Sequence, residues 1–256
     1  RFDAFLKEYW TRWSPQWKPS TLATHDGYRR LYLDNAFKGV FIDELNEADI
    51  TKWFSDLNNR AGPGAANRTL EILKNMLNKA EAWGYRLENT NPCRSVRPNK
   101  RRQCERFMSA DELARLGNAL AQLRIDDNPT MRASGAAITL LLLTGCRCRE
   151  ILTLQWQDVK GSRLLLRDSK TGPRTVWLGP VAREVIDSLP RRARIPWLFW
   201  NTQYHRPIRS LQYMWDAVRE QADLGKLRIH DLRHTFASHA AMNKETLPMI
   251  GRLLGH

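Results

Sequence analysis

The most informative stretch of this sequence is HDLRHTFASHAAMNKETLPMIGRLLGH, which runs from His230 to His256. His230 and Arg233 are three residues apart, so a helix through this stretch places both side chains on one face. A second short apolar helix is predicted between Thr246 and Leu254, and His256 follows it. Two imidazoles and one guanidinium suit the charge of a phosphate better than that of a carbonyl or a sugar.

The composition is that of a large folded protein with an excess of positive charge. The chain has 256 residues, 42% of them hydrophobic, which is enough for two packed domains and excludes wholesale disorder. Lysine and arginine number 41 against 27 acidic residues, so the net charge is +14. This excess favours a polyanionic partner, most simply nucleic acid, although a charge that serves only solubility stays open.

Cysteine usage and hydropathy indicate a reducing compartment away from the membrane. The chain has 4 cysteines, none of them in a CxxC pair, and a chain of this size needs no disulfides. The most apolar stretch, 136–143, has 8 residues including Thr139 and is too short to span a bilayer. We therefore expect a cytoplasmic, nucleoid-associated protein with no membrane partner. Arg1 is not a native start, so we also expect the native chain to begin earlier.

The periodicity predicts a mainly α-helical fold with a small antiparallel β-sheet. A stripe of leucines at the helical period lies between Leu70 and Leu77, and Gly84 provides a stop. Earlier helices are predicted from Asn46 onward and over 21–33. The first hundred residues therefore form a compact bundle of about four helices.

A basic, proline-containing stretch divides the chain. The stretch from Cys93 through Arg106 contains six basic residues and one acid. Such a stretch is typical of a domain boundary and also suits contact with a phosphate backbone, with a plain solvated linker as the alternative. The expected DNA-binding residues are Arg94, Arg97, Lys100, Arg101 and Arg102. The predicted organisation is a helical domain over 1–91, a linker over 92–107 and a second domain over 108–256, which close around duplex DNA.

The second domain combines helices with a hairpin. Ser109 and Glu112 have the spacing of a capping box at its first helix. Further on, 164–166 and 175–178 are predicted as two short strands of a hairpin with Lys170 near its tip. More helices are predicted near residues 147–156, 181–189, 210–222, 231–242 and 246–254.

Five side chains on separate segments form a coherent chemical set: Arg147, Lys170, His230, Arg233 and His256. Each arginine can offer a fork of donors to the oxygens of one phosphate. A lysine on a hairpin tip can protonate a leaving oxygen, and histidine can move a proton near neutral pH. A nucleophile is missing from the set.

The motifs that carry these residues resemble those of the tyrosine recombinase (phage integrase) family, in the family's order and over essentially the whole chain. They are TGCRCRE over 144–150, SKTG over 169–172, HDLRHT over 230–235 and LGH over 254–256. The resemblance implies a SAM-like core-binding domain at the N-terminus and a catalytic domain at the C-terminus.

The resemblance also implies roles for single residues. Arg147 and Arg233 would clamp the scissile phosphate and stabilise the charge of the transition state. Lys170 would protonate the departing 5′ oxygen, His230 would be the acid/base partner of the nucleophile, and His256 would donate a hydrogen bond to a phosphate oxygen. Glu150, near Arg147 on its helix, would support the site.

What the resemblance implies for function is site-specific recombination of double-stranded DNA through a 3′-phosphotyrosyl intermediate, by a homotetramer on DNA. No metal or other cofactor is expected, because arginines supply the positive charge. The family's tyrosine follows the LGH motif, and all 6 tyrosines of this chain precede the HDLRHT motif. We therefore expect this chain to be truncated before its nucleophile and inactive for cleavage.

Three alternatives remain. The first is a zinc site, because His230 and His234 flank an acidic residue at the spacing of HExxH; Asp231 is shorter than the glutamate of that motif, and Arg233 opposes a metal. The second is a DNA-binding protein of the same fold without catalysis. The third is a type IB topoisomerase-like enzyme, which the short chain and helical N-terminal region disfavour.

Overall fold

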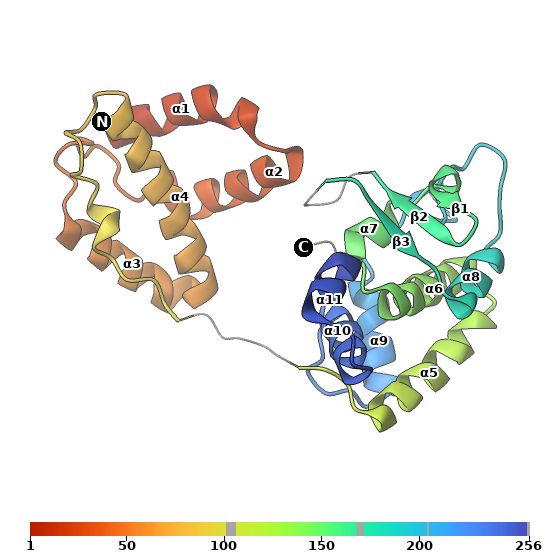
Figure 1. Cartoon of the computed structure of the whole chain (residues 1–256). Helices are drawn as coiled ribbons and strands as arrows, with labels where there is room; N and C mark the ends of the chain where they lie inside the picture. The colour runs from red at the N-terminus through yellow and green to blue at the C-terminus, as the bar shows by residue number, and fades with distance from the viewer. Residues whose placement is uncertain (101–105, 168–171, 204, 255–256) are drawn as a thin grey trace. The chain divides into compact units, whose positions relative to one another are not determined.

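The computed structural model describes residues 1–100, 106–167, 172–203 and 205–254. The chain forms two compact units, Arg1–Gln103 (unit 1) and Cys104–His256 (unit 2), each with its own hydrophobic core (Figure 1). The predicted fold class is confirmed, because the described residues are mainly helical and carry small antiparallel sheets. No helix in these ranges is long and apolar enough to cross a membrane.

Unit 1 is a helical bundle in which α4 contacts α1, α2 and α3. The predicted start at Asn46 is confirmed, since its side chain accepts from the Asp49 N–H at 3.1 Å in a capping box. Gly84, at φ +79°, follows the end of α4. The stretch 21–33 is divided between α2 and the π-helical η2. The elements are α1 (Phe2–Trp13), η1 (Ser14–Gln16), α2 (Pro19–Tyr28), η2 (Arg29–Leu33), α3 (Glu47–Ala61), α4 (Pro63–Ala82) and η3 (Pro92–Arg94).

Of the predicted linker, residues 92–100 belong to unit 1, and Arg106 and Phe107 belong to unit 2. Cys93 is buried, and the Asn91 side chain donates to the Lys74 carbonyl at 2.9 Å. Further along, the backbone N–H of Asn99 donates to Asn67 Oδ1 at 2.8 Å, and Asn67 donates back to the Asn99 carbonyl at 2.8 Å. The bundle therefore holds its own C-terminal segment up to this point.

Unit 2 is built around α6, which contacts α5, α7, α8, α9 and α10. Ile138, Leu140 and Leu141 of this helix are almost completely buried, whereas Leu143 near its end is exposed. The predicted capping box of Ser109 and Glu112 starts α5. The helices are α5 (Ala110–Arg124), α6 (Pro129–Thr144), α7 (Cys148–Leu152), η4 (Trp156–Asp158), α8 (Pro180–Asp187), α9 (Gln212–Gln221), α10 (Asp231–Met242) and α11 (Leu247–Leu254).

Two small sheets complete unit 2. β1 (Val159–Lys160), β2 (Arg163–Leu166) and β3 (Arg174–Trp177) form an antiparallel sheet in which Leu164 pairs with Val176. A second sheet, β4 (Trp200–Asn201) with β5 (Arg206–Pro207), was not predicted, because strands of two residues carry no readable alternation. Lys170 lies outside the described residues, so its place near a hairpin tip stays a prediction.

Candidate active site

The candidate site begins where α6 ends. Gly145 terminates this helix in the left-handed conformation, with φ +61°. A Cβ at this position would lie 2.5 Å from Phe236 Cδ1 and 2.8 Å from Leu254 Cδ2, so glycine is required by both space and backbone angle. The loop therefore approaches α10 and the end of α11 closely and brings Arg147 to them.

Arg147 precedes α7 and pairs with a buried carboxylate one turn later. Its backbone N–H and its Nη1 donate to Oε2 and Oε1 of Glu150, each at 2.9 Å. The Glu150 side chain is 4% exposed and that of Arg147 is 23% exposed. Burial raises the pKa of Glu150, but hydrogen bonds from Arg147 and Arg174 outweigh it and hold this pKa below its usual value. Glu150 is therefore charged and fixes Arg147 at the edge of the solvent.

Arg233, in the first turn of α10, is buried and binds two backbone carbonyls. Its Nη1 donates to the Gly145 carbonyl and its Nη2 to the Leu254 carbonyl, both at 2.7 Å. Glycine 145 is two residues before Arg147, and Leu254 is the last residue of α11. Arg233 thus links three segments that are far apart in the sequence.

A third arginine, Arg174 at the start of β3, belongs to the same cluster, and the sequence analysis did not select it. Its Nη2 donates to Glu150 Oε2 at 2.9 Å and its Nη1 to the Leu253 carbonyl at 2.9 Å. Nothing in a single sequence distinguishes this arginine from the other basic residues near the hairpin. Its role becomes visible only when the fold places β3 beside α7 and α11.

Arg147 and Arg174 both pair with the one carboxylate of Glu150, and the positive charge of Arg233 lies close to theirs, so positive charge gathers at this point. Burial lowers the pKa of Arg233, and the positive charges of Arg147 and Arg174 lower it further. Like charges this close repel one another, and a bound anion would relieve that repulsion. The arrangement is therefore suited to an anion with several acceptor oxygens, such as a phosphodiester.

His230 lies immediately before α10, beside the cluster. Its ring is 5.3 Å from that of His234, nearly perpendicular to it. Loss of hydration lowers the pKa of His230, and the nearby positive charges of His234 and Arg233 lower it further. The imidazole is therefore mainly neutral near pH 7 and can accept a proton.

The acidic residue between these histidines is engaged by an arginine. Asp231 is buried, accepts from the Arg228 backbone N–H at 2.8 Å, and pairs with Arg228 Nη2 at 2.6 Å. Within the described ranges, no group of three or more His, Cys, Asp or Glu side chains could hold a metal ion. The zinc interpretation therefore finds no ligand set in this part of the chain.

The structure brings together Arg147, Glu150 and Arg233, with His230 on the adjoining turn. Lys170 and His256 lie outside the described residues. Arg174, four residues after Lys170, and Leu254, two residues before His256, both contact the cluster.

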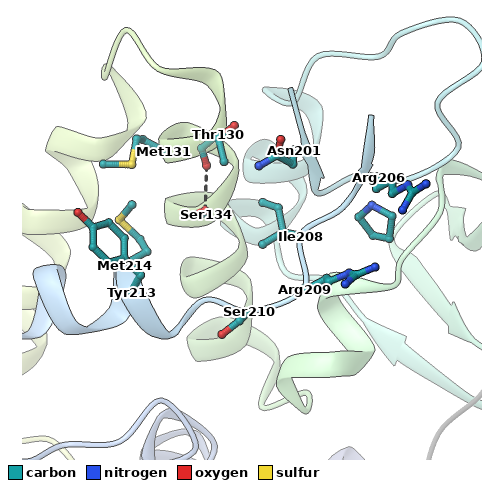
Figure 2. Close-up of a pocket in the computed structure, with 11 residues that line it drawn as sticks. Thr130, Met131, Ser134, Asn201, Arg206, Ile208, Arg209, Ser210, Tyr213 and Met214 are labelled. Atoms are coloured by element: carbon teal, nitrogen blue, oxygen red, sulfur yellow. Dashed lines mark hydrogen bonds between the residues drawn. The ribbon is translucent and has the colours of Figure 1, made fainter. Parts of the chain in front are cut away.

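The one described tyrosine of unit 2, Tyr213, lies in a different place. It lines a pocket of about 530 Å³ together with Thr130 and Met131 at the start of α6 and with Arg209 (Figure 2). Arg147 follows the opposite end of the same helix, about 21 Å away at 1.5 Å per residue. Tyr213 is therefore not positioned beside the arginine cluster.

The basic residues expected to contact DNA differ in their surroundings. Arg94 forms an ion pair with Glu81 and a hydrogen bond with Asn89. Arg97 and Lys100 are exposed, and Arg101 and Arg102 lie outside the described residues. Contact between any of these side chains and DNA stays a prediction.

Comparison with known proteins identifies the class to which this fold and cluster belong. Residues 106–256 match the Phage integrase family, and the chain belongs to that family. It is similar to the integrase of Haemophilus phage HP1 (strain HP1c1), with 29% identity over 227 residues, 87% of this chain and 61% of that protein. It is also similar to the tyrosine recombinase XerD of Rhizobium meliloti (strain 1021), with 27% identity over 86% of this chain and 75% of that protein. The chain thus spans about three fifths of the HP1 integrase.

Solved structures show the same fold at low sequence identity. A lambda integrase (75-356) dimer bound to a COC′ core site matches with a TM-score of 0.78 and 18% identity, over 99% of this chain and 94% of that chain. The Tn1549 transposon integrase in complex with circular intermediate DNA matches with a TM-score of 0.75 and 16% identity, over 98% and 90%.

Proposed function

We propose that this protein is a site-specific tyrosine recombinase of the integrase type, which binds duplex DNA and cleaves and rejoins its strands. The observation that carries the proposal is the cluster of Arg147, Arg174 and Arg233 near the buried carboxylate of Glu150. Its excess positive charge is suited to a phosphodiester and to the additional charge that develops on phosphorus in the transition state. Membership of the phage integrase family supports the same reaction.

In the proposed reaction a tyrosine oxygen attacks the scissile phosphorus, and the bond from phosphorus to the 5′ oxygen breaks. Arg147 and Arg233 hold the non-bridging oxygens, and His256 donates a further hydrogen bond to one of them. His230 accepts the tyrosine proton, and Lys170 donates a proton to the departing 5′ oxygen. Attack by a 5′ hydroxyl on the 3′-phosphotyrosyl bond then rejoins a strand and releases the tyrosine. The arginines supply the positive charge, so the proposal includes no metal or other cofactor.

We further propose that none of the tyrosines in these 256 residues is the nucleophile. Tyr9 is buried in unit 1, where burial raises its pKa to about 12. Tyr85 of unit 1 donates to Glu8, and Tyr213 lines the pocket at the start of α6. This chain on its own should therefore bind DNA without forming a covalent adduct.

The proposed partner is double-stranded DNA, with the active assembly a homotetramer on it. The net charge of +14 favours a polyanion. Among similar structures, one lambda integrase is a dimer bound to a core site and another is a tetramer bound to a Holliday junction. We propose that both units contact the duplex, with residues 92–107 as the linker between a core-binding domain and a catalytic domain.

The test uses a DNA duplex that is selected from a random pool by its binding to the protein. The duplex is nicked near the cleavage site, so that the short fragment released by cleavage is lost and rejoining cannot occur. Protein that includes the native C-terminal sequence should become covalently attached to the 3′ phosphate in EDTA. Arg147→Gln should abolish attachment, whereas Arg219→Gln, at an exposed ion pair with Asp216, should not. Attachment only with Mg²⁺ would exclude the mechanism, and binding without attachment would favour a non-catalytic DNA-binding protein. Relaxation of supercoils without strand exchange would favour the topoisomerase alternative.

A further inference from the structure

We propose that Arg174 is a positioning residue, which shares the Glu150 carboxylate with Arg147 and so leaves Arg147 with uncompensated positive charge for a phosphate. This inference rests on the proposed function, because it assigns Arg174 a part in binding the scissile phosphate. Arg174 acts through Glu150 and Arg147 and does not itself contact DNA.

The contacts of Arg174 reach two elements that are distant in sequence. Nη2 donates to Glu150 Oε2 at 2.9 Å and lies 3.6 Å from Cys146 Sγ. Nη1 donates to the Leu253 carbonyl at 2.9 Å. One side chain from β3 therefore connects the loop before α7 to the last turn of α11.

Arg174 is less accessible to a substrate than Arg147 is. Its side chain is 11% exposed, and both terminal nitrogens are hydrogen-bonded within the protein. Its Nε is buried and has no hydrogen-bond partner in the described part of the chain. A phosphate approaching from solvent therefore meets Arg147, at 23% exposure, before it meets Arg174.

The two carboxylate oxygens of Glu150 are divided between two arginines. Oε1 of Glu150 accepts from Arg147 Nη1, while Oε2 accepts from the Arg147 backbone and from Arg174 Nη2. If Arg174 is removed, Arg147 and Glu150 become a one-to-one ion pair with no net charge. Such a pair attracts a phosphate less strongly, because the carboxylate offsets the one guanidinium that remains beside it.

A lysine cannot reproduce this arrangement. The planar guanidinium reaches Glu150 and Leu253 at once because its nitrogens diverge at a fixed angle. An ammonium at the end of a flexible chain is a single point and cannot bridge the same two partners. Arg174→Lys therefore keeps the charge of the cluster but loses its geometry.

The experiment measures binding of inorganic phosphate to the 256-residue chain by calorimetry, which needs neither the nucleophile nor a target sequence. Arg174→Met should weaken binding about tenfold, because the Glu150 carboxylate then offsets the charge of Arg147 alone. Arg174→Lys should also weaken it. Arg163→Met is the matched control, because Arg163 lies on the adjacent strand, is exposed and packs on Trp177. In an Arg147→Gln background, Arg174→Met should change the affinity by less than about twofold.

The inference is overturned if Arg174→Met weakens phosphate binding equally in the parent and in the Arg147→Gln background while Arg174→Lys has no effect. Arg174 would then be only a source of positive charge. Absence of phosphate binding to the parent chain would overturn it as well. If Arg174→Met does not fold, Arg174→Lys decides, and an affinity within about twofold of the parent contradicts the proposal. The adduct assay tests the proposed function separately. If the variants bind phosphate as predicted but no covalent DNA adduct forms, recombination is rejected and the role of Arg174 in anion binding stands.

Discussion

Arg233 donates a 2.7 Å hydrogen bond to the carbonyl of Gly145, although 88 residues separate them in the sequence. This bond places the first turn of α10 against the loop that carries Arg147. Arg233 and Arg147 are the two arginines that would hold a phosphate. The distance between them is set because Arg233 binds the backbone two residues before Arg147.

Gly145→Ala should destabilise unit 2 by about 1–3 kcal/mol, because the new methyl group would overlap Phe236 and Leu254 and would require an unfavourable backbone angle. Urea unfolding followed by the fluorescence of the buried Trp215 measures the change. Gly117→Ala is the control: this glycine is exposed in α5 with open space around it, and the substitution should be neutral or stabilising. Equal effects of the two substitutions would contradict the close approach described above.

Arg233→Lys should cost roughly a hundredfold or more in the rate of strand cleavage by a form of the protein that carries the nucleophilic tyrosine. A lysine can satisfy only one of the two carbonyls that Arg233 binds, and it cannot present a fork to a phosphate. Single-turnover cleavage of the nicked duplex measures the rate, with Arg219→Lys as the control. A rate near that of the parent would show that Arg233 does not bind the reacting phosphate.

DNA affinity should fall steeply as salt rises, since counterion release supplies much of the binding free energy. Replacing Arg97 and Lys100 by alanine should reduce the slope of log K against log salt by about two, at roughly 0.9 per phosphate contact. Arg183→Ala should leave the slope unchanged, because Arg183 is already paired with Asp187 at 2.8 Å. Fluorescence anisotropy at several salt concentrations gives these slopes, and an affinity independent of salt would exclude the proposed DNA surface.

The pKa of His230 should lie below 6.5, and His234→Ala should raise it by removing a positive neighbour. The unfolded chain then takes up a proton at this site before the folded chain does. The contribution of His230 to stability is therefore present above the ordinary histidine value and decreases as the pH falls through it. An NMR titration of the imidazole proton measures the pKa directly, and a value above 6.5 would contradict the geometry around α10.

The elements with strong local signals could be predicted from sequence. Asn46 with Asp49, and Ser109 with Glu112, are capping boxes whose side chains lie three residues apart, so adjacent residues determine the helix start. The second sheet, β4 with β5, could not be predicted, because its strands of two residues are held by tertiary contacts. A helix was predicted near 147–156, but α7 is only five residues long and ends at Leu152.

For the candidate site, sequence identified the charged residues that lie in recognisable motifs, such as Arg147 and Arg233. It did not identify Arg174, whose importance depends on a carbonyl 79 residues away. It also could not show that Glu150 is shared between two arginines, because that requires β3 and α7 to be neighbours.

The atoms that anchor these arginines have a consequence for how the family can diverge. Arg233 and Arg174 bind the main-chain oxygens of Gly145, Leu253 and Leu254, and every amino acid carries such an oxygen. Substitutions in α11 can therefore accumulate without loss of the anchor, whereas a one-residue insertion within that helix would rotate the carbonyls by about 100° and remove it. Relatives at 16–18% identity can thus keep the same architecture while most of their side chains change. Selection at this end of α11 would act on the length of the helix more strongly than on the identity of its residues.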